Sequence, residues 1–249
     1  MVQRAGSHTP TMTDFEKAGV SEEDWRAATA SCVELRVANV IDETHDSRSL
    51  VFEIPVELAE RFHYRAGQFL SFKIPYAAHV LTRSYSLASS PDTDREHKVT
   101  IKRVEDGRIS NWMNDRVEVG TCLMVAPPAG SFVLNDADGK IILFGGGSGI
   151  TPVISIVKTA LATSRRSMKL IYANRDERSI IFKAELDELA RTHPDRLEIV
   201  HCLDDVDGFL DRDDVKRHVG SDVGSDFYLC GPGPFMAIVE EALRELHAD

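Results

Sequence analysis

The amino-acid sequence predicts two domains, an antiparallel β-barrel followed by a doubly wound α/β domain built on a parallel sheet. In the first half of the chain, short β-branched and aromatic runs follow one another between Pro, Gly and Asp turns. In the second half, apolar strand-like runs alternate with helical stretches, and the pattern changes at residues 135–139. We therefore assign residues 31–135 to the barrel and 136–249 to the α/β domain, after a polar tail and a short helix in residues 1–30.

The elements of the barrel follow from its apolar runs and its turns. Ser21 to Asp24 form a capping box that predicts a short helix ending near Ala30. One further helix is predicted over residues 110–116, between the fifth and sixth strands. The runs with strand character span residues 32–41, 49–54, 67–74, 83–89, 98–104, 121–126 and 131–134.

The elements of the second domain alternate between strand and helix, which is typical of a parallel sheet. Strands are predicted over residues 140–144, 168–173, 197–202 and 227–230, and helices over residues 151–162, 180–192, 211–219 and 234–247. In a doubly wound sheet the first and fourth of these strands are usually neighbours across the topological switch point, where ligands bind.

Charge and composition exclude several classes of function. The chain has 29 Lys and Arg against 40 Asp and Glu, a net charge of −11, so we expect no nucleic-acid partner and no membrane insertion. No apolar run is long enough for a membrane helix, and the first 19 residues lack the apolar core of a secretory signal. The four cysteines are widely scattered, which predicts no metal site, no iron–sulfur cluster within these residues and a cytoplasmic location.

Two glycine-rich turns follow the first and fourth strands of the α/β domain. The first runs from Gly145 to Pro152 and leads into a helix, whose free N–H groups suit the pyrophosphate of a dinucleotide. It departs from the GxGxxG pattern because Pro152 stands at the third glycine, and it could simply be a tight turn. The second runs from Cys230 to Met236. Alone, Cys230 would be read as a small buried residue, but the two loops are expected to face one crevice.

The end of the second strand carries residues that could select the coenzyme. A carboxylate there would bind the adenosine ribose of NAD, whereas an arginine would accept the extra phosphate of NADP. The chain offers Asn174, Arg175 and Asp176 in succession, with Glu177 next. The two carboxylates favour NADH slightly, because they would repel a 2′-phosphate. Arg175 could instead pair with either carboxylate and meet no ligand.

Two segments of the barrel contain residues suited to a flavin. Arg83 to Ser86 supply a cation for a pyrophosphate, an aromatic face for a ring and a hydroxyl, although Arg and Tyr on one strand are commonly just surface residues. Residues 107–112 form a turn into a helix whose N-terminal amides could hold phosphate. An ordinary helix cap at Ser110 explains that segment equally well.

Taken together, these motifs resemble those of the ferredoxin–NADP reductase superfamily, which pairs an FAD-binding barrel with a nicotinamide-binding α/β domain. The resemblance spans residues 32–245, and its motifs stand in the family order: RSYS at 83–86, GRISNW at 107–112, GGGSGITP at 145–152 and CGPGPFM at 230–236. Three further segments are similar to oxygenase reductases of the 3-ketosteroid 9α-hydroxylase and phenylacetyl-CoA epoxidase type: GQF at 67–69, VTIKR at 99–103 and YANRD at 172–176.

The resemblance implies roles for individual residues. Arg83 would bind the flavin pyrophosphate, Tyr85 would stack on the isoalloxazine, Ser86 would hydrogen-bond near N5, and Cys230 would sit beside the nicotinamide carbon that gives up hydride. Tyr85, Ser86 and Cys230 are thus the expected catalytic residues, and no metal ligand is expected. The residues expected to bind FAD or NAD(P)H are Arg83, Ser84, Tyr85, Ser86, Ile101, Lys102, Gly107, Ile109, Ser110, Asn111, Gly145, Gly146, Gly147, Ser148, Gly149, Thr151, Pro152, Asn174, Arg175, Cys230, Gly231, Pro232, Phe235 and Met236.

The implied function is hydride transfer from NAD(P)H to FAD, followed by single-electron transfer to an iron–sulfur or oxygenase partner. The family usually continues into a further strand, and this subgroup into a plant-type [2Fe–2S] domain. Neither follows here, so we expect either a shortened form or a separate ferredoxin, with a terminal oxygenase. Two alternatives stay open. A stand-alone flavin or quinone reductase would lose its flavin on dialysis, and a non-catalytic nucleotide-sensing module would show no NAD(P)H-driven dye reduction.

Overall fold

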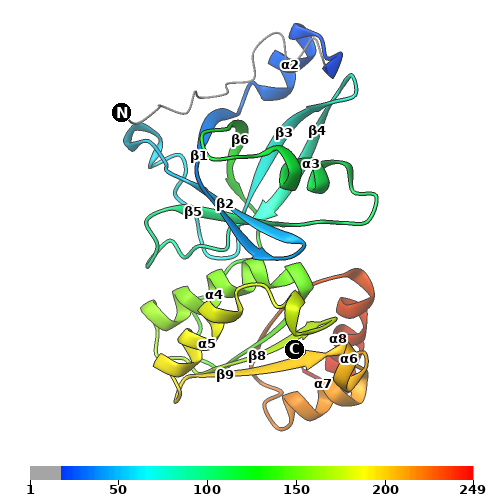
Figure 1. Cartoon of the computed structure of the whole chain (residues 1–249). Coiled ribbons are helices and arrows are strands. Elements are labelled where there is room, and N and C mark those ends of the chain that lie inside the picture. Colours follow the sequence, from blue (N-terminus) through cyan, green and yellow to red (C-terminus); the bar gives the residue numbers. More distant parts are fainter. Residues whose placement is uncertain (1–17, 249) are drawn as a thin grey trace, which may run out of the picture.

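The computed structural model describes residues 18–248. They contain two β-sheets, one in the upper and one in the lower half of the molecule as drawn in Figure 1. An antiparallel sheet of six strands belongs to the first half of the chain, and a parallel sheet of four strands to the second. The predicted fold class is confirmed. Residues 1–17 of the predicted tail lie outside the described residues.

The first sheet runs in the order β4-β3-β6-β1-β2-β5 and closes on itself. Its two outer strands meet through a bridge between Leu87 and Val99 and through the N–H of Ala88, which donates to the carbonyl of Lys98 at 2.7 Å. In β3 alternate residues point into the barrel, where Leu70 and Phe72 are fully buried together with Phe52 of the sheet. The strands are β1 (Val33–Thr44), β2 (Ser47–Phe52), β3 (Phe69–Tyr76), β4 (His79–Ser86), β5 (His97–Lys102) and β6 (Cys122–Ala129).

Within the described residues, two helices accompany the barrel, together with one 3₁₀ turn, η1 (Val56–Leu58). Helix α2 (Glu22–Thr29) is capped by Ser21, whose hydroxyl oxygen accepts from the N–H of Asp24 at 3.1 Å, as the sequence predicts. Helix α3 (Arg108–Arg116) lies between β5 and β6 and begins two residues earlier than expected. Its N-cap is Gly107, which offers no side chain to the first-turn N–H groups.

The second sheet runs in the order β10-β7-β8-β9, so the first and fourth strands are neighbours as expected. Core residues of α4 and α5 pack on one face of the sheet, and those of α7 and α8 pack on the other. The strands are β7 (Ile141–Gly146), β8 (Met168–Asn174), β9 (Leu197–Leu203) and β10 (Asp226–Cys230). The helices and turns are η2 (Gly147–Gly149), α4 (Ile150–Thr163), η3 (Glu177–Ser179), α5 (Lys183–Thr192), α6 (Asp204–Asp207), α7 (Arg212–Val219) and α8 (Gly233–Glu245).

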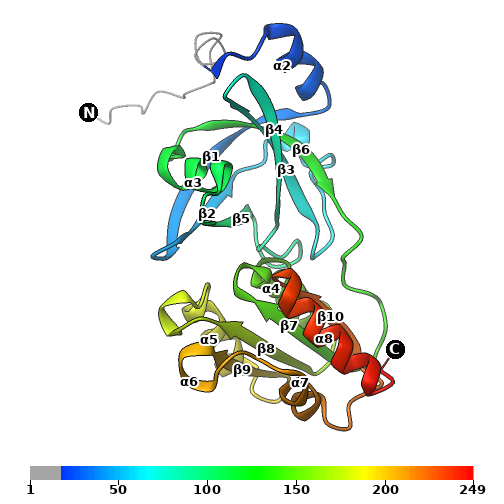
Figure 2. The ribbon, with the colours of Figure 1, turned by 90° about the vertical axis from the view of Figure 1, so that its right-hand side faces the viewer.

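Two sequence predictions about these elements are wrong. Residues 131–134 form no strand; they belong to the connection between the sheets, which Figure 2 shows running from β6 to β7. Phe132 is apolar there because it packs edge-on against Tyr228, with ring centroids 5.7 Å apart. The helix expected from residue 180 starts at Lys183, because Phe182 adopts a left-handed backbone conformation with φ of 62°. Helix α6 was not predicted.

A buried ionic cluster joins the two halves of the molecule. Lys158 on α4 donates to Asp94 of the barrel at 2.5 Å and to Glu185 on α5 at 2.7 Å, while Lys98 on β5 donates to the same Glu185 at 2.9 Å. The Lys158 side chain is only 10% exposed.

No helix in residues 18–248 is long and apolar enough to cross a membrane.

Candidate functional site

A cavity of about 570 Å³ lies between the barrel and the α/β domain, and both supply its walls. Fourteen of the sequence-predicted residues line it, together with Thr100, Val104 and Arg108, which were not predicted. The predicted residues in the walls are Arg83, Ser84, Tyr85, Ser86, Lys102, Gly107, Ile109, Ser110, Ser148, Gly149, Thr151, Cys230, Gly231 and Pro232.

The barrel wall of the cavity is formed by the end of β4. Tyr85 is half-buried, and its ring packs against Phe72 with centroids 5.8 Å apart. Burial raises the pKa of Tyr85 to about 12, although the charge of Arg83 opposes the shift, so the phenol stays protonated. Arg83 is exposed and donates only to the carbonyl of Thr82 at 2.8 Å, and no carboxylate among the described residues pairs with it.

The start of α3 forms a second part of this wall. The amides of the first turn of a helix have no partner inside the helix. Gly107 supplies no side-chain cap to them, so they are available to a ligand. Ser110 is buried and its hydroxyl oxygen accepts from the N–H of Val104 at 3.3 Å, which fixes the turn. The helix dipole makes this end positive.

The charge of the cavity is opposite to that of the molecule. Its walls contain three cations, Arg83, Lys102 and Arg108, and none of the described residues that line it is Asp or Glu. The chain as a whole carries −11. The cavity therefore suits an anionic ligand, and the planar guanidinium groups suit phosphate oxygens in particular.

The opposite wall consists of the two glycine-rich loops, which touch. A Cβ on Gly149 would lie 2.0 Å from the carbonyl oxygen of Cys230, so only glycine allows this approach. Gly147 adopts φ of +52° and faces the Lys102 ammonium. Burial raises the pKa of the Cys230 thiol, which is therefore neutral near pH 7.

A second cavity, of about 640 Å³, continues from the first, since Lys102 and Pro232 line both. Gly146, Asn174 and Phe235 also contribute to it. Asn174 is 5% exposed, and its carboxamide atoms have no hydrogen-bond partner among the described residues. The nearby Tyr172 hydroxyl donates to the carbonyl of Gly147 at 3.1 Å and accepts from the N–H of Ile181 at 3.2 Å, and the Asn174 side chain lies beside it. A buried amide without partners is suited to a polar ligand.

Arg175 lies at the mouth of the second cavity, but its partner is unexpected. Its Nη2 donates to Oδ2 of Asp46, at the turn between β1 and β2, at 2.8 Å, rather than pairing with Asp176 or Glu177. Asp46 also faces the Lys102 ammonium at 3.8 Å. Burial would raise the pKa of Asp46, but the Thr44 hydrogen bond and the Lys102 charge outweigh it and lower the pKa.

Five predicted residues line neither cavity. Ile101 points into the barrel core and is 1% exposed, so only its backbone could serve a ligand. Asn111 donates its amide to the carbonyl of Val104, and Gly145, Pro152 and Met236 lie beside the loops without lining the cavities. Sequence reasoning missed Thr100 and Arg108, although both stand within or next to quoted motifs. It also missed Asp204, Phe209, Leu210, Pro234 and Ile238.

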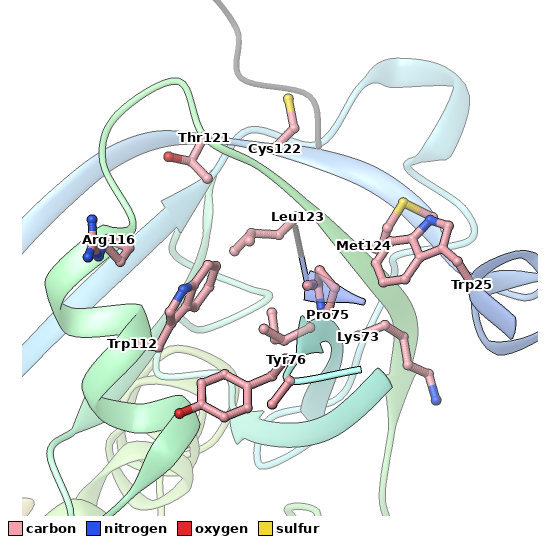
Figure 3. Close-up of a pocket in the computed structure, with 13 residues that line it drawn as sticks. Trp25, Lys73, Pro75, Tyr76, Trp112, Arg116, Thr121, Cys122, Leu123 and Met124 are labelled. Carbon is pink, nitrogen blue, oxygen red and sulfur yellow. The ribbon is translucent and has the colours of Figure 1, made fainter. Parts of the chain in front are cut away.

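A third cavity, of about 640 Å³, lies at the other side of α3. Figure 3 shows Trp112 and Tyr76 at one side of it, and Trp25 of α2 beside Met124 of β6 at the other. Trp112 belongs to the GRISNW segment, yet it faces this apolar cavity and not the one between the domains.

The chain combines a closed barrel, a doubly wound domain and a cationic cavity between them. This combination defines a two-domain oxidoreductase that binds dinucleotides. The comparisons agree. The family described as "Oxidoreductase FAD-binding domain" matches residues 34–134, and "Oxidoreductase NAD-binding domain" matches residues 143–241. The chain therefore belongs to the FAD- and NAD-binding reductases of the ferredoxin–NADP reductase superfamily.

Several relatives are reductase components. The chain is 48% identical over 211 residues to the ferredoxin reductase component of 3-ketosteroid-9-alpha-monooxygenase from Rhodococcus rhodochrous, covering 84% of this chain and 60% of that protein. It is 32% identical to one of the subunits of 1,2-phenylacetyl-CoA epoxidase from Escherichia coli, covering 85% and 64%. A cytochrome P450 reductase from Amycolatopsis has a similar structure, with a TM-score of 0.76, 26% identity and coverage of 88% and 67%. The chain thus spans about three fifths of the length of these sequence relatives.

Proposed function

We propose that this chain is an FAD-dependent NAD(P)H reductase that passes electrons singly to an iron–sulfur or oxygenase partner. The observation that carries the proposal is the shared cavity, in which Tyr85 and Ser86 of the barrel face Thr151 and Cys230 of the α/β domain. When bound, FAD accepts hydride and releases electrons one at a time. The chain is proposed to supply the orientation of the two dinucleotides, with a domain boundary at residues 135/136.

The residues present fit FAD. A dinucleotide carries a pyrophosphate, and the cavity offers Arg83, Arg108 and the uncapped N-terminus of α3 to hold it, with no carboxylate among the described residues of its walls. Tyr85 is proposed to present its ring to the isoalloxazine, and Ser86 its hydroxyl near N5. In the α/β domain, Gly149 and Thr151 would hold the nicotinamide nucleotide, with Cys230 beside the carbon that gives up hydride.

The test is an anaerobic titration of the purified, FAD-loaded protein with NADH and with NADPH. We expect the flavin absorption to bleach, and mass analysis of the released cofactor to show FAD and not FMN. A one-electron dye should then be reduced at the expense of the nicotinamide nucleotide. Absence of bleaching with both coenzymes would overturn the proposal. Loss of the flavin on dialysis would instead favour a stand-alone flavin or quinone reductase.

For the coenzyme, we propose a preference for NADH. Arg175, the group that could bind a 2′-phosphate, is held by Asp46, and Asp176 stands next to it. Replacing Asp176→Asn should therefore raise kcat/KM for NADPH severalfold and leave NADH nearly unchanged, while Arg175→Ala should raise KM for NADPH. The matched control is Asp195→Asn, an exposed carboxylate outside both cavities. Wild-type protein that uses NADPH at least about tenfold better than NADH would contradict the preference.

The partner is proposed from the relatives, which include a ferredoxin reductase component and the reductase subunit of a monooxygenase. A separate plant-type ferredoxin should be reduced by the FAD-loaded protein with NADH. A reducing compartment such as the cytoplasm is proposed because no disulfide joins any two of the four cysteines. The absence of an iron–sulfur cluster in these residues stays a prediction, to be tested by iron analysis.

A further inference from the structure

A row of hydrogen-bonded side chains runs across the barrel wall that faces the α/β domain. The hydroxyls of Thr100 on β5 and Ser49 on β2 lie 2.7 Å apart, and the Ser49 hydroxyl donates to Oε1 of Glu43 on β1 at 2.5 Å. Thr100 is 3% exposed and Ser49 is fully buried. The neighbouring strands place Ser49 directly opposite Thr100 in the sheet. Three proton-carrying groups therefore form one unbroken chain.

The two ends of this row lie in different surroundings. Thr100 lines the cavity between the domains, in the same wall as Tyr85 and Ser86. Glu43 lies at the other end, half-buried, close to Lys98 on β5 and Glu185 on α5. These two residues line a separate polar groove of about 1040 Å³. Glu43 itself is not among the residues that line this groove, but it is half-buried and so reaches solvent beside Lys98. The row therefore links the site to the surface at Glu43 without passing through the mouth of the cavity.

The proposed reaction produces a proton that must leave the site. Oxidation of the coenzyme by single electrons is balanced as NAD(P)H → NAD(P)⁺ + 2 e⁻ + H⁺, with one electron passing to each of two molecules of a one-electron acceptor. The cations in the walls disfavour a proton that remains in the cavity. Neither the thiol of Cys230 nor the phenol of Tyr85 can be the final acceptor of this proton, because both are already protonated.

We propose that Thr100, Ser49 and Glu43 form the path by which this proton leaves the site, an inference that rests on the function proposed above. Oγ1 of Thr100 takes the proton from the cavity and passes its own proton to Oγ of Ser49. Ser49 passes its own proton to Oε1 of Glu43, which becomes a neutral acid and then releases the proton to the solvent that reaches its half-buried carboxyl. Each hydroxyl ends with one proton, so both are restored once they rotate back. Glu43 is the proton acceptor, and the two hydroxyls relay the proton to it.

The charges around Glu43 suit this task. Burial raises its pKa, whereas the Ser49 hydrogen bond and the Lys98 charge lower it and the Glu185 charge raises it. The raised pKa brings the carboxyl closer to neutrality, where it can both take up and release a proton. Lys98 also pairs with Glu185, and Glu185 pairs with Lys158. Lys158 in turn pairs with Asp94, so the positive and negative charges of these neighbours largely balance.

The test measures proton release directly, by stopped flow with a pH indicator dye, as FAD-loaded protein passes electrons from NADH to ferricyanide. Proton release should slow by roughly tenfold in Glu43→Gln, Ser49→Ala and Thr100→Val. This decrease is smaller than the usual loss of rate when an acid–base group is removed, because water can partly replace the path. The solvent isotope effect should rise in the same variants. Thr100→Ser, which keeps the hydroxyl, should restore the rate. Glu34→Gln, an exposed carboxylate on the same strand, is the matched control.

A second measurement needs no cofactor. In flavin-free protein labelled with ¹³C at the Glu carboxyl, the signal absent from Glu43→Gln should titrate above the ordinary glutamate range. It should titrate higher still in Ser49→Ala, which removes a hydrogen bond to the charged form. Unchanged proton release and isotope effect in all three variants, with normal NADH oxidation, would overturn the path and leave the proposed function intact. Wild-type protein that oxidises neither coenzyme would overturn the proposed function itself.

Discussion

Tyr85 is the residue in which the proposed flavin binding and barrel packing are most closely combined. Its ring contacts Phe72 in the core and lines the cavity. Tyr85→Ala should weaken FAD binding by about 1–3 kcal/mol, the usual worth of an aromatic stacking face. Flavin titration monitored by fluorescence gives this value, and Tyr85→Phe should retain most of the affinity. A variant that melts lower as apo-protein but binds FAD as tightly per folded molecule would show that Tyr85 is only a core residue.

Cys230 is expected to act by packing and not as a thiolate, because burial raises its pKa. Cys230→Ser should slow flavin reduction by NADH and leave FAD affinity nearly unchanged, since hydride transfer requires the reacting atoms about 3–3.5 Å apart. Stopped-flow reduction at several pH values measures this, and the wild-type profile should show no thiolate limb near neutrality. Cys202→Ser, a buried thiol lining neither cavity, should reduce at the normal rate. A normal rate in Cys230→Ser as well would remove Cys230 from the site.

At the scale of elements, the turn from β7 to α4 depends on its contact with the loop after β10. Gly149→Ala would place a methyl 2.0 Å from the Cys230 carbonyl, so the two loops must separate. Overpacking of this kind costs about 1–3 kcal/mol of unfolding free energy. Binding of ADP-ribose, measured by calorimetry, should weaken together with the urea midpoint. Gly139→Ala, where an added methyl meets nothing within 4 Å, should change neither, and equal effects at both positions would refute the argument from close approach.

Elements were predictable where their pattern is local. The alternation in β3 and the apolar run of β7 each lie within one segment, so both were found. Residues 131–134 have the same composition as a strand, but their partners are an aromatic ring, the carbonyl of Ala66 and the guanidinium of Arg65. The delayed start of α5 depends on a single left-handed residue, Phe182, which sequence periodicity does not show.

The candidate site was predictable to a similar extent. The glycine turns and the Arg83–Ser86 strand carry their chemistry in short motifs, and the structure brings them to one cavity. The partner of Arg175 could not be found this way, because Asp46 is 129 residues away and becomes a neighbour only when the domains meet. The same holds for the contact between Glu43 and Ser49, which a β-hairpin with an irregular register creates.

At the scale of the whole molecule, the Lys158 cluster holds the domains together. Lys158→Ala would leave Asp94 and Glu185 close to each other without their shared cation. It should cost about 3 kcal/mol of unfolding free energy, the lower end of the range for a broken buried pair, because the carboxylates are partly exposed. Urea denaturation at pH 7 measures this. Lys183→Ala, on the exposed side of α5, is the control and should change stability little. An unchanged midpoint in Lys158→Ala would show that the cluster does not hold the domains.

The pH dependence of the same cluster has a definite sign. Burial opposes ionisation of Glu185, but Lys98 and Lys158 outweigh it and lower its pKa. Its contribution is therefore complete above the ordinary glutamate value of 4.5 and is lost as the pH falls through the lower folded value. The difference in stability between wild type and Lys158→Ala should shrink below about pH 4.5. A difference that stays constant down to pH 3 would contradict this assignment.

The contact between Gly149 and the Cys230 carbonyl also dictates when the site can exist during synthesis. The first loop leaves the ribosome about 80 residues before the second, and β7 must wait for β10 to become its neighbour in the sheet. The barrel, whose strands are all earlier in the chain, can collapse and take up flavin first. In a nascent chain the barrel wall of the cavity can therefore form before the wall that contains the two glycine-rich loops.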